Sequence, residues 1–264
     1  MEGEATPLPG EELVDASPVA EASPIPAGEP ADAATTERVT TAIANVIACY
    51  NTGDFLGVGA LFTPNGLMEE FGTTNPYDLE LFLAGGPPLD LLAVEDVQVH
   101  ADGRFSADVL SSFGGAQLTR ERFFLVESDD FLLVDSTPEL EIEAPAGAVT
   151  IEAAMVDFAF ELSETTAPAN TPLVFEVTNV GEYPHELVLI QLPEGATVDQ
   201  ILDGSVGFED IQFYGATYSE GGQPAPDLVL LGLEPGTYTL VCFVDVPEGM
   251  PHVARGMFAE LTVE

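Results

Sequence analysis

The stretch LVCFVDVPEGMPHVARGM, residues 240–257, decides how the C-terminal part of this chain is organised and what it can bind. An apolar run leads into it, and a second run, residues 258–263, follows it. Cys242, His252 and Met257 lie in this one segment, so a thiolate, an imidazole and a thioether can meet at one end of two strands. His185 begins another apolar run upstream. These four side chains form a candidate ligand set for a soft metal ion.

Copper is the metal that this set favours, because two imidazoles, a thiolate and a weak thioether are the ligands of blue copper sites. Zinc accepts cysteine and histidine but does not use methionine. Met250 is an alternative to Met257, and we prefer Met257 because the strand that follows it directly would hold it in place. The simpler interpretation is that Cys242 is a core residue and that the histidines are ordinary polar residues.

The composition restricts the partners. The chain has 264 residues with 46 acidic residues, five arginines and no lysine, and its formal net charge is −41. This charge argues against binding nucleic acid or an anionic membrane surface. It suits a salty environment or a basic partner, and the even spread of the acids favours the first.

No stretch approaches the ~18 apolar residues of a transmembrane span, and no export signal follows Met1. Residues 1–34 mix prolines with acidic and small residues, so we expect a disordered acidic tether. Such a segment is typical of the spacer after a removed export signal. We therefore expect an extracytoplasmic protein, in the periplasm or at the cell surface.

Residues 35–138 read as an α+β domain. Apolar residues recur at helical spacing from Val39 to Tyr50, and residues 51–53 end the helix. After a weaker helical region, strands are predicted at 92–100, 104–113, 118–127 and 131–136. Helices followed by an antiparallel meander indicate an α+β fold.

This part resembles the nuclear-transport-factor-2-like (NTF2-like) superfamily, through the run IACYNTGDF at residues 47–55 and the order of its elements. The resemblance implies a helix inside a curved sheet, whose cone serves as a ligand pocket, an active site or a packed core. The candidate pocket groups are Asp54, Glu69, Glu70 and His100, but their spacing forms no acid–base pair. We expect His100 to be an exposed strand-end residue.

Cys49 lies one step off the apolar stripe of the predicted helix, so we expect it to be a buried small hydrophobe. A bridge between Cys49 and Cys242 is the open alternative, since these are the only cysteines.

Residues 139–264 read as an all-β sandwich, beyond a boundary that proline and glycine mark at 137–147. A short helix is expected at 196–202, capped near Thr197. Seven strands are predicted, at 149–154, 157–162, 173–179, 187–192, 227–231, 236–243 and 258–263.

This part resembles the cupredoxins, the plastocyanin-like blue copper proteins. The motifs that carry the resemblance are DFAF at 157–160, NVG at 179–181 followed by Pro184-His185, PGTY at 235–238, and Cys242 with His252 and Met257. The resemblance implies a Greek-key sandwich with one type 1 copper ion on His185, Cys242, His252 and Met257. It further implies one-electron transfer with redox partner proteins, with His252 as the expected exit for the electron.

Two features depart from the cupredoxin pattern. The loop between Cys242 and His252 is longer than in the smallest members, and Glu186 stands where the family often has asparagine. In the family, the backbone N–H at that position donates to the thiolate, and a glutamate can keep this contact.

Two other functions remain open. One is an enzyme whose NTF2-like cone binds a small molecule while copper relays electrons. The other is a surface binding module that stores copper or lacks it.

Overall fold

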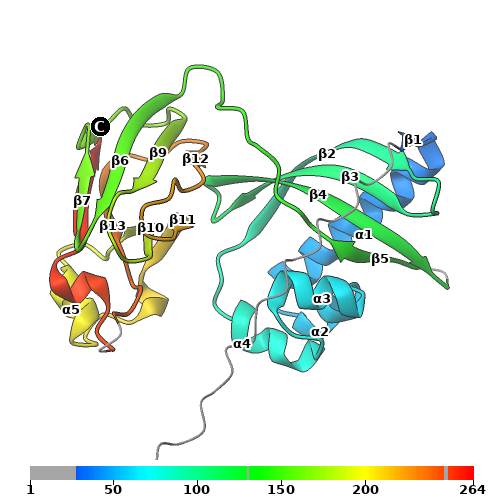
Figure 1. Ribbon diagram of the computed structural model, residues 1–264, viewed down its shortest axis with the longest axis horizontal. Helices are drawn as coiled ribbons and strands as arrows, with labels where there is room; N and C mark the ends of the chain where they lie inside the picture. The colour runs from blue at the N-terminus through cyan, green and yellow to red at the C-terminus, as the bar shows by residue number, and fades with distance from the viewer. Residues whose placement is uncertain (1–27, 130, 247–248) are drawn as a thin grey trace, which may run out of the picture.

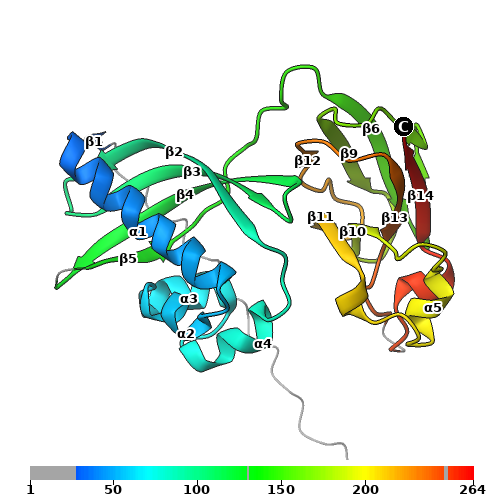
Figure 2. The same cartoon turned by 180° about the vertical axis from the view of Figure 1, so that it is seen from behind.

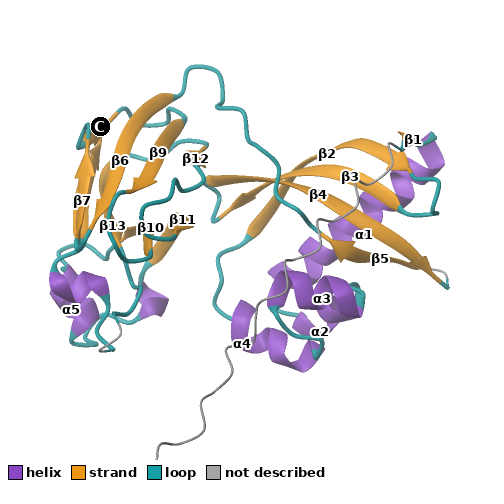
Figure 3. Cartoon of the chain, viewed as in Figure 1, coloured by secondary structure: helices purple, strands orange, loops and turns teal. Residues whose placement is uncertain are grey.

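The computed structural model describes residues 28–129, 131–246 and 249–264 (Figure 1). The described chain is mostly β-sheet with a few helices. It forms an N-terminal part, residues 29–140, and a C-terminal part, residues 149–263, that lie side by side (Figures 1 and 2). The helices gather under the sheet of the first part and at one end of the second (Figure 3).

The helix α1 (Ala33–Asn51) organises the N-terminal part. Its N-cap, Asp32, accepts a hydrogen bond from the backbone N–H of Thr35 at 2.8 Å. Apolar residues at helical spacing bury one face of it, as predicted. The other helices of this part are α2 (Phe55–Ala60), α3 (Pro64–Phe71), η1 (Pro76–Asp78) and α4 (Leu79–Leu83).

The sheet of the N-terminal part is an antiparallel meander, as predicted. Its strands are β2 (Leu89–Val99), β3 (Phe105–Phe113), β4 (Gln117–Ser128) and β5 (Phe131–Ser136), with the short β1 (Glu29–Pro30) paired to β2. Apolar side chains of α1, α2, α3 and the sheet form one buried cluster between the helices and the strands. This cluster includes half-buried Cys49 at its margin.

Two expectations for the N-terminal part need correction. Residues 1–27 of the predicted tether lie outside the described residues, but β1 and the start of α1 fall within residues 29–34, so that end of it is folded. His100 is buried and only 6% exposed, because Gly28 beside β1 and the ring of Phe124 cover it. Its Nε2 lies 2.8 Å from the Ser106 hydroxyl, so the expected exposed strand end is wrong.

The C-terminal part consists of two facing layers of strands. One layer has the order β12-β9-β6-β7, and the other has the order β11-β10-β13-β14-β8. The first contains β6 (Val149–Val156), β7 (Ala159–Leu162), β9 (Leu173–Asn179) and β12 (Leu228–Leu230). The second contains β8 (Thr166–Ala167), β10 (His185–Gln191), β11 (Gln212–Ser219), β13 (Gly236–Val241) and β14 (Phe258–Val263).

The apolar side chains of both layers meet in a second buried cluster, which includes Leu187, Leu189, Cys242 and Met257. The outer side of β10 and β13 is also covered, because α5 (Val198–Leu202) and η3 (His252–Arg255) pack on it. The 3-10 turn η2 (Phe208–Asp210) leads from α5 into β11. Strand β10 is therefore buried on both faces, which fixes its first residue, His185, deep in the fold.

The two parts are joined through β4 and β12, which pair at Gln117 and Leu230. The Gln117 side chain donates to the Ala216 carbonyl and accepts from the Ala216 backbone N–H, both at 3.0 Å. The layer β12-β9-β6-β7 of the C-terminal part thus continues the sheet of the N-terminal part, while the layer β11-β10-β13-β14-β8 is a separate sheet. No helix among the described residues is long and apolar enough to cross a membrane.

Candidate metal centre

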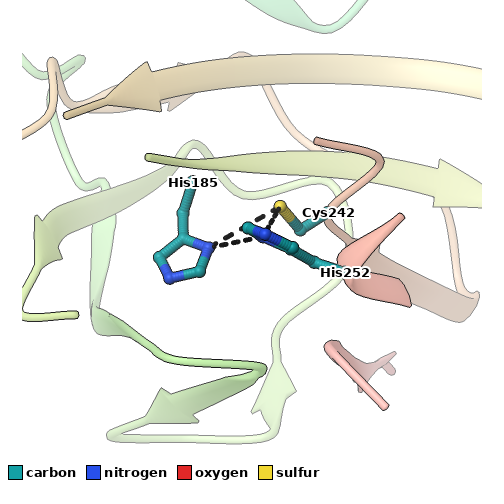
Figure 4. Close-up of side chains that lie close together, drawn as sticks. All are labelled: His185, Cys242 and His252. Carbon is teal, nitrogen blue, oxygen red and sulfur yellow. Dashed lines mark hydrogen bonds between the residues drawn. The ribbon is translucent and has the colours of Figure 1, made fainter. Parts of the chain in front are cut away.

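Three side chains from three elements meet at one end of the C-terminal part. Cys242 directly follows β13, His185 begins β10, and His252 begins η3. All three are buried, and their potential ligand atoms lie within 4.8 Å of one another. Figure 4 shows the two rings and the thiol directed toward one another. Among the described residues this is the group that could hold a metal ion.

The facing atoms are the Nδ1 nitrogens and the sulfur. The His185 and His252 Nδ1 atoms lie 2.9 Å apart. The Cys242 Sγ atom lies 3.4 Å from His252 Nδ1 and 3.9 Å from His185 Nδ1. These three atoms are close enough together to be candidate ligands of a single ion.

The backbone of the loop 242–257 fixes two of these residues. The Val253 N–H donates to the Cys242 carbonyl at 2.8 Å, and the His252 N–H donates to the Val244 carbonyl at 2.9 Å. Gly256 ends η3 in the left-handed region at φ 99°, which lets the chain turn into β14.

Met257 lies beside Cys242. Its backbone carbonyl accepts from the Cys242 N–H at 3.3 Å, and its side chain is fully buried in the same apolar cluster as the cysteine. Met250 is 47% exposed. Burial therefore holds the Met257 side chain more firmly than that of Met250.

Burial controls the protonation of the three residues. It raises the pKa of the Cys242 thiol to about 11, although the backbone N–H groups of Glu186 and Val244 oppose this rise. It lowers the pKa of His185, against the pull of Asp157. It also lowers the pKa of His252, together with the nearby charges of His185 and Arg255. The two rings are thus kept neutral, which is the form that offers lone pairs to a metal ion.

Glu186 supports the cysteine from two sides. Its backbone N–H lies 3.5 Å from the Cys242 sulfur as a donor. Its side-chain Oε1 accepts from the Phe243 N–H at 2.8 Å, which ties β10 to the residue after the cysteine. Burial raises the pKa of this carboxyl group. Glutamate at position 186 therefore allows the expected backbone contact to the sulfur.

Asp157 and Phe158 form the two-residue turn between β6 and β7, and they contact one histidine each. An Asp157 Oδ1 lies 3.2 Å from His185 Nε2, and the Phe158 ring lies 5.0 Å from the His252 ring, edge-on. Phe158 adopts φ 67°, in the left-handed region that non-glycine residues avoid. Sequence reasoning marked this DFAF segment but did not assign these contacts.

The remaining candidate pocket groups do not lie together at a site. Asp54 caps α2 by accepting from the Gly57 N–H at 2.9 Å. Glu69 accepts from Asn65 on the exposed side of α3, and Glu70 accepts from Thr137. Cys49 and Cys242 are both free thiols.

Comparison with known proteins gives a partial likeness. No family model matches the sequence, and no curated protein sequence matches it. Among solved structures, the chain is similar to reduced auracyanin from Roseiflexus castenholzii, with 22% identity over 44% of this chain and 96% of that one and a TM-score of 0.33.

Two further structures show the same extent of similarity. Auracyanin A, titled a "blue" copper protein from Chloroflexus aurantiacus, has 19% identity over 45% of this chain and all of that one, with a TM-score of 0.32. Rusticyanin from Thiobacillus ferrooxidans has 20% identity over 45% of this chain and 79% of that one, with a TM-score of 0.32. These neighbours are cupredoxins, and they correspond to less than half of the chain.

Proposed function

We propose that this protein is a mononuclear type 1 copper protein that transfers single electrons. His185, Cys242 and His252 would hold one copper ion, with Met257 as a weak fourth ligand. The observation that carries this proposal is the meeting of one thiol and two neutral imidazoles, all buried, with ligand atoms within 4.8 Å of one another.

The donor set fits copper better than other metals. Sulfur and imidazole exclude calcium and magnesium, which take oxygen ligands. Zinc would accept these three residues, but it has no use for a buried thioether beside them. The set of two imidazoles, one thiolate and one weak thioether is that of electron-transfer copper sites.

When bound, copper supplies one-electron exchange between its two oxidation states. The residues of this chain hold the ligands in place during that exchange. Hydrogen bonds from the loop backbone fix Cys242 and His252, while Asp157 holds His185. A buried and tightly packed site changes little in shape. The ligands would therefore need little rearrangement energy when the charge of the copper ion changes.

The route of the electron differs from the expectation that His252 itself is the exit. His252 is only 1% exposed, because the rings of Phe158 and Tyr183 lie 5.0 Å and 6.2 Å from its ring. Tyr183 is 37% exposed. We therefore place the exit for the electron at the surface formed by these two rings and Arg255, whose guanidinium lies 4.7 Å from the Phe158 ring centre.

The remaining expectations are part of the same proposal. Residues 139–264 would be the copper domain and residues 35–138 an NTF2-like domain. The protein would work outside the cytoplasm with redox partner proteins. An acidic partner would dock at Arg255, the one arginine after Arg122, because the many acidic residues of the chain repel it elsewhere.

Voltammetry of the copper-loaded chain tests the function. We expect a reversible one-electron wave in the wild-type protein and no such wave in Cys242→Ala. A Cys49→Ala variant is the matched control, because Cys49 lies in the other part of the chain, and it should behave as the wild type. A wild-type chain that holds copper without a reversible wave would contradict electron transfer and favour a copper-storing module.

A further inference from the structure

We infer that Asp157 is a positioning residue that sets the tautomers of both histidines of the candidate site. The inference rests on the proposed function for its consequence in copper binding, but the tautomers themselves are properties of the protein alone. Three observations carry it. They are the contact of His185 with Asp157, the contact of His185 with His252, and the lack of a hydrogen-bond partner for His252 Nε2 among the described residues.

The first contact fixes the proton of His185. The Asp157 carboxylate accepts from the Glu182 N–H at 3.0 Å and from the Tyr183 N–H at 3.3 Å, both backbone donors. These donors hold the carboxylate in place as an acceptor. His185 Nε2 lies 3.2 Å from the same oxygen, so this nitrogen must carry a hydrogen and donate it. His185 is then the Nε2–H tautomer, and its Nδ1 lone pair faces the site.

The second contact follows from the first. His185 Nδ1 has no hydrogen, so across the 2.9 Å separation it can only accept from His252 Nδ1. His252 is therefore the Nδ1–H tautomer. The Cys242 sulfur, 3.4 Å from the same nitrogen, is a second group that can accept this hydrogen.

The third observation agrees with this assignment. His252 Nε2 is buried and has no hydrogen-bond partner among the described residues. A buried N–H without an acceptor is the more costly arrangement, since donors are rarely left unpaired in protein interiors. When the hydrogen is on His252 Nδ1, it faces two acceptors, His185 Nδ1 and the Cys242 sulfur. Nε2 then carries an unpaired acceptor, which costs less than an unpaired N–H.

The local backbone is shaped for this contact. Asp157 precedes Phe158 in the turn, and the left-handed conformation of Phe158 persists only when packing determines it. Gly181 lies against the contact, where an added Cβ would collide with the Asp157 carboxylate and lie 2.9 Å from His185 Nε2. Gly181 does not have a positive φ, so an alanine there would disturb the contact without backbone strain.

The two histidines therefore have different roles when copper binds. His185 presents its Nδ1 lone pair already aligned. His252 must first move its proton from Nδ1 to Nε2, where no described group accepts it. Asp157 acts through His185, whose tautomer and ring orientation it fixes. In other metal sites, carboxylates that accept from the non-ligating nitrogen of a histidine ligand have the same effect.

Nitrogen-15 NMR of the histidine rings in copper-free protein tests the inference. The chain has three histidines, and His100→Asn removes the one outside the site. We expect His185 as the Nε2–H tautomer and His252 as the Nδ1–H tautomer. Asp157→Ala removes the oxygen that accepts from His185 Nε2, and it should remove the preference of His185. Gly181→Ala should do the same by a different route, while Glu161→Gln, an exposed carboxyl group on β7, should change nothing.

Copper affinity, measured by competition with a chelator, gives the second readout. Asp157→Ala and Gly181→Ala should weaken copper binding roughly 10- to 100-fold, with Glu161→Gln unchanged. His185 found as the Nδ1–H tautomer in the wild type would overturn the inference, as would both variants keeping the wild-type tautomers. A wild type with the expected tautomers that binds no copper would instead contradict the proposed function and leave the tautomer assignment standing.

Discussion

The Nδ1 atoms of His185 and His252 lie 2.9 Å apart, although 67 positions separate the two residues in the chain. One begins a strand that is buried on both faces, and the other begins a short turn that packs on the outer side of that strand. The contact is therefore a product of the whole sandwich, and it brings both imidazole rings to the Cys242 sulfur. It is also the contact that a metal ion would replace.

Replacing Met257 with leucine should leave copper bound and raise the reduction potential. A thioether is a weak donor that favours the oxidised ion, so its removal shifts the balance toward Cu(I) more than it changes binding. The swap nearly preserves the side-chain volume, so it should cost less than about 1.5 kcal/mol of stability. Voltammetry of the two copper-loaded proteins measures the shift.

Met250→Leu is the matched control, because Met250 is 47% exposed and should leave the potential unchanged. If Met250→Leu shifted the potential and Met257→Leu did not, the loop would present the other methionine and the assignment of the fourth ligand would be wrong.

Glu121 should make the stability of the N-terminal part depend on pH. Burial, together with the charges of Glu70 and Glu139, raises the pKa of its carboxyl group to about 7. In the unfolded chain this carboxyl group has an ordinary, lower pKa. The folded state therefore binds the Glu121 proton more tightly than the unfolded state does. The stability that this binding contributes is fully present below about pH 4.5 and is lost as the pH rises through about 7.

Glu121→Gln should thus be more stable than the wild type at pH 8, on the order of 1 kcal/mol after allowance for solvent screening, and similar to it near pH 4.5. Thermal unfolding of both proteins across this pH range measures the difference in their stability. The titration of the other acids is common to both proteins and cancels in this difference. A constant difference at all pH values would show that Glu121 does not titrate as described.

A glutamate-specific protease should cut the chain between residues 140 and 149. This connection has no regular structure, and both Glu141 and Glu143 are exposed within it. Pro138 and Leu140 are protected, because they pair with Arg122 and Arg120 of β4. Two fragments, with copper retained by the C-terminal one, would support separate domains at 35–138 and 139–264. Rapid further degradation of both fragments after the first cut would show that neither part folds without the other.

Much of the fold follows from local pattern. The apolar spacing along Val39 to Tyr50 predicts α1, which ends at Asn51, within the predicted stop, and the four strands of the N-terminal meander lie where period-two patterns and turns predict them. Strand β11 was not predicted. It is an edge strand in which exposed, half-buried and buried residues follow no strict alternation and which contains Gly215, so its sequence lacks a clear apolar pattern.

Part of the candidate site could also be predicted from the sequence, and part could not. His185 and Cys242 could be predicted because they stand at the ends of apolar runs, and His252 because it lies in the loop that follows Cys242. The contact of Asp157 with His185 could not, because it depends on how the β6–β7 turn meets the backbone of Glu182 and Tyr183. Nothing in the sequence of the β6–β7 turn predicts that it meets residues 182–183, and nothing in the sequence of that segment predicts the turn.

The visible absorption spectrum after addition of Cu(II) tests the central claim most directly. A thiolate-bound Cu(II) site has an intense charge-transfer band, and we expect the wild-type chain to turn blue at one equivalent of copper. Cys242→Ser should remove the band, and Cys49→Ser should keep it. A colourless wild-type protein, or a blue Cys242→Ser variant, would contradict the assignment of a copper site to His185, Cys242 and His252.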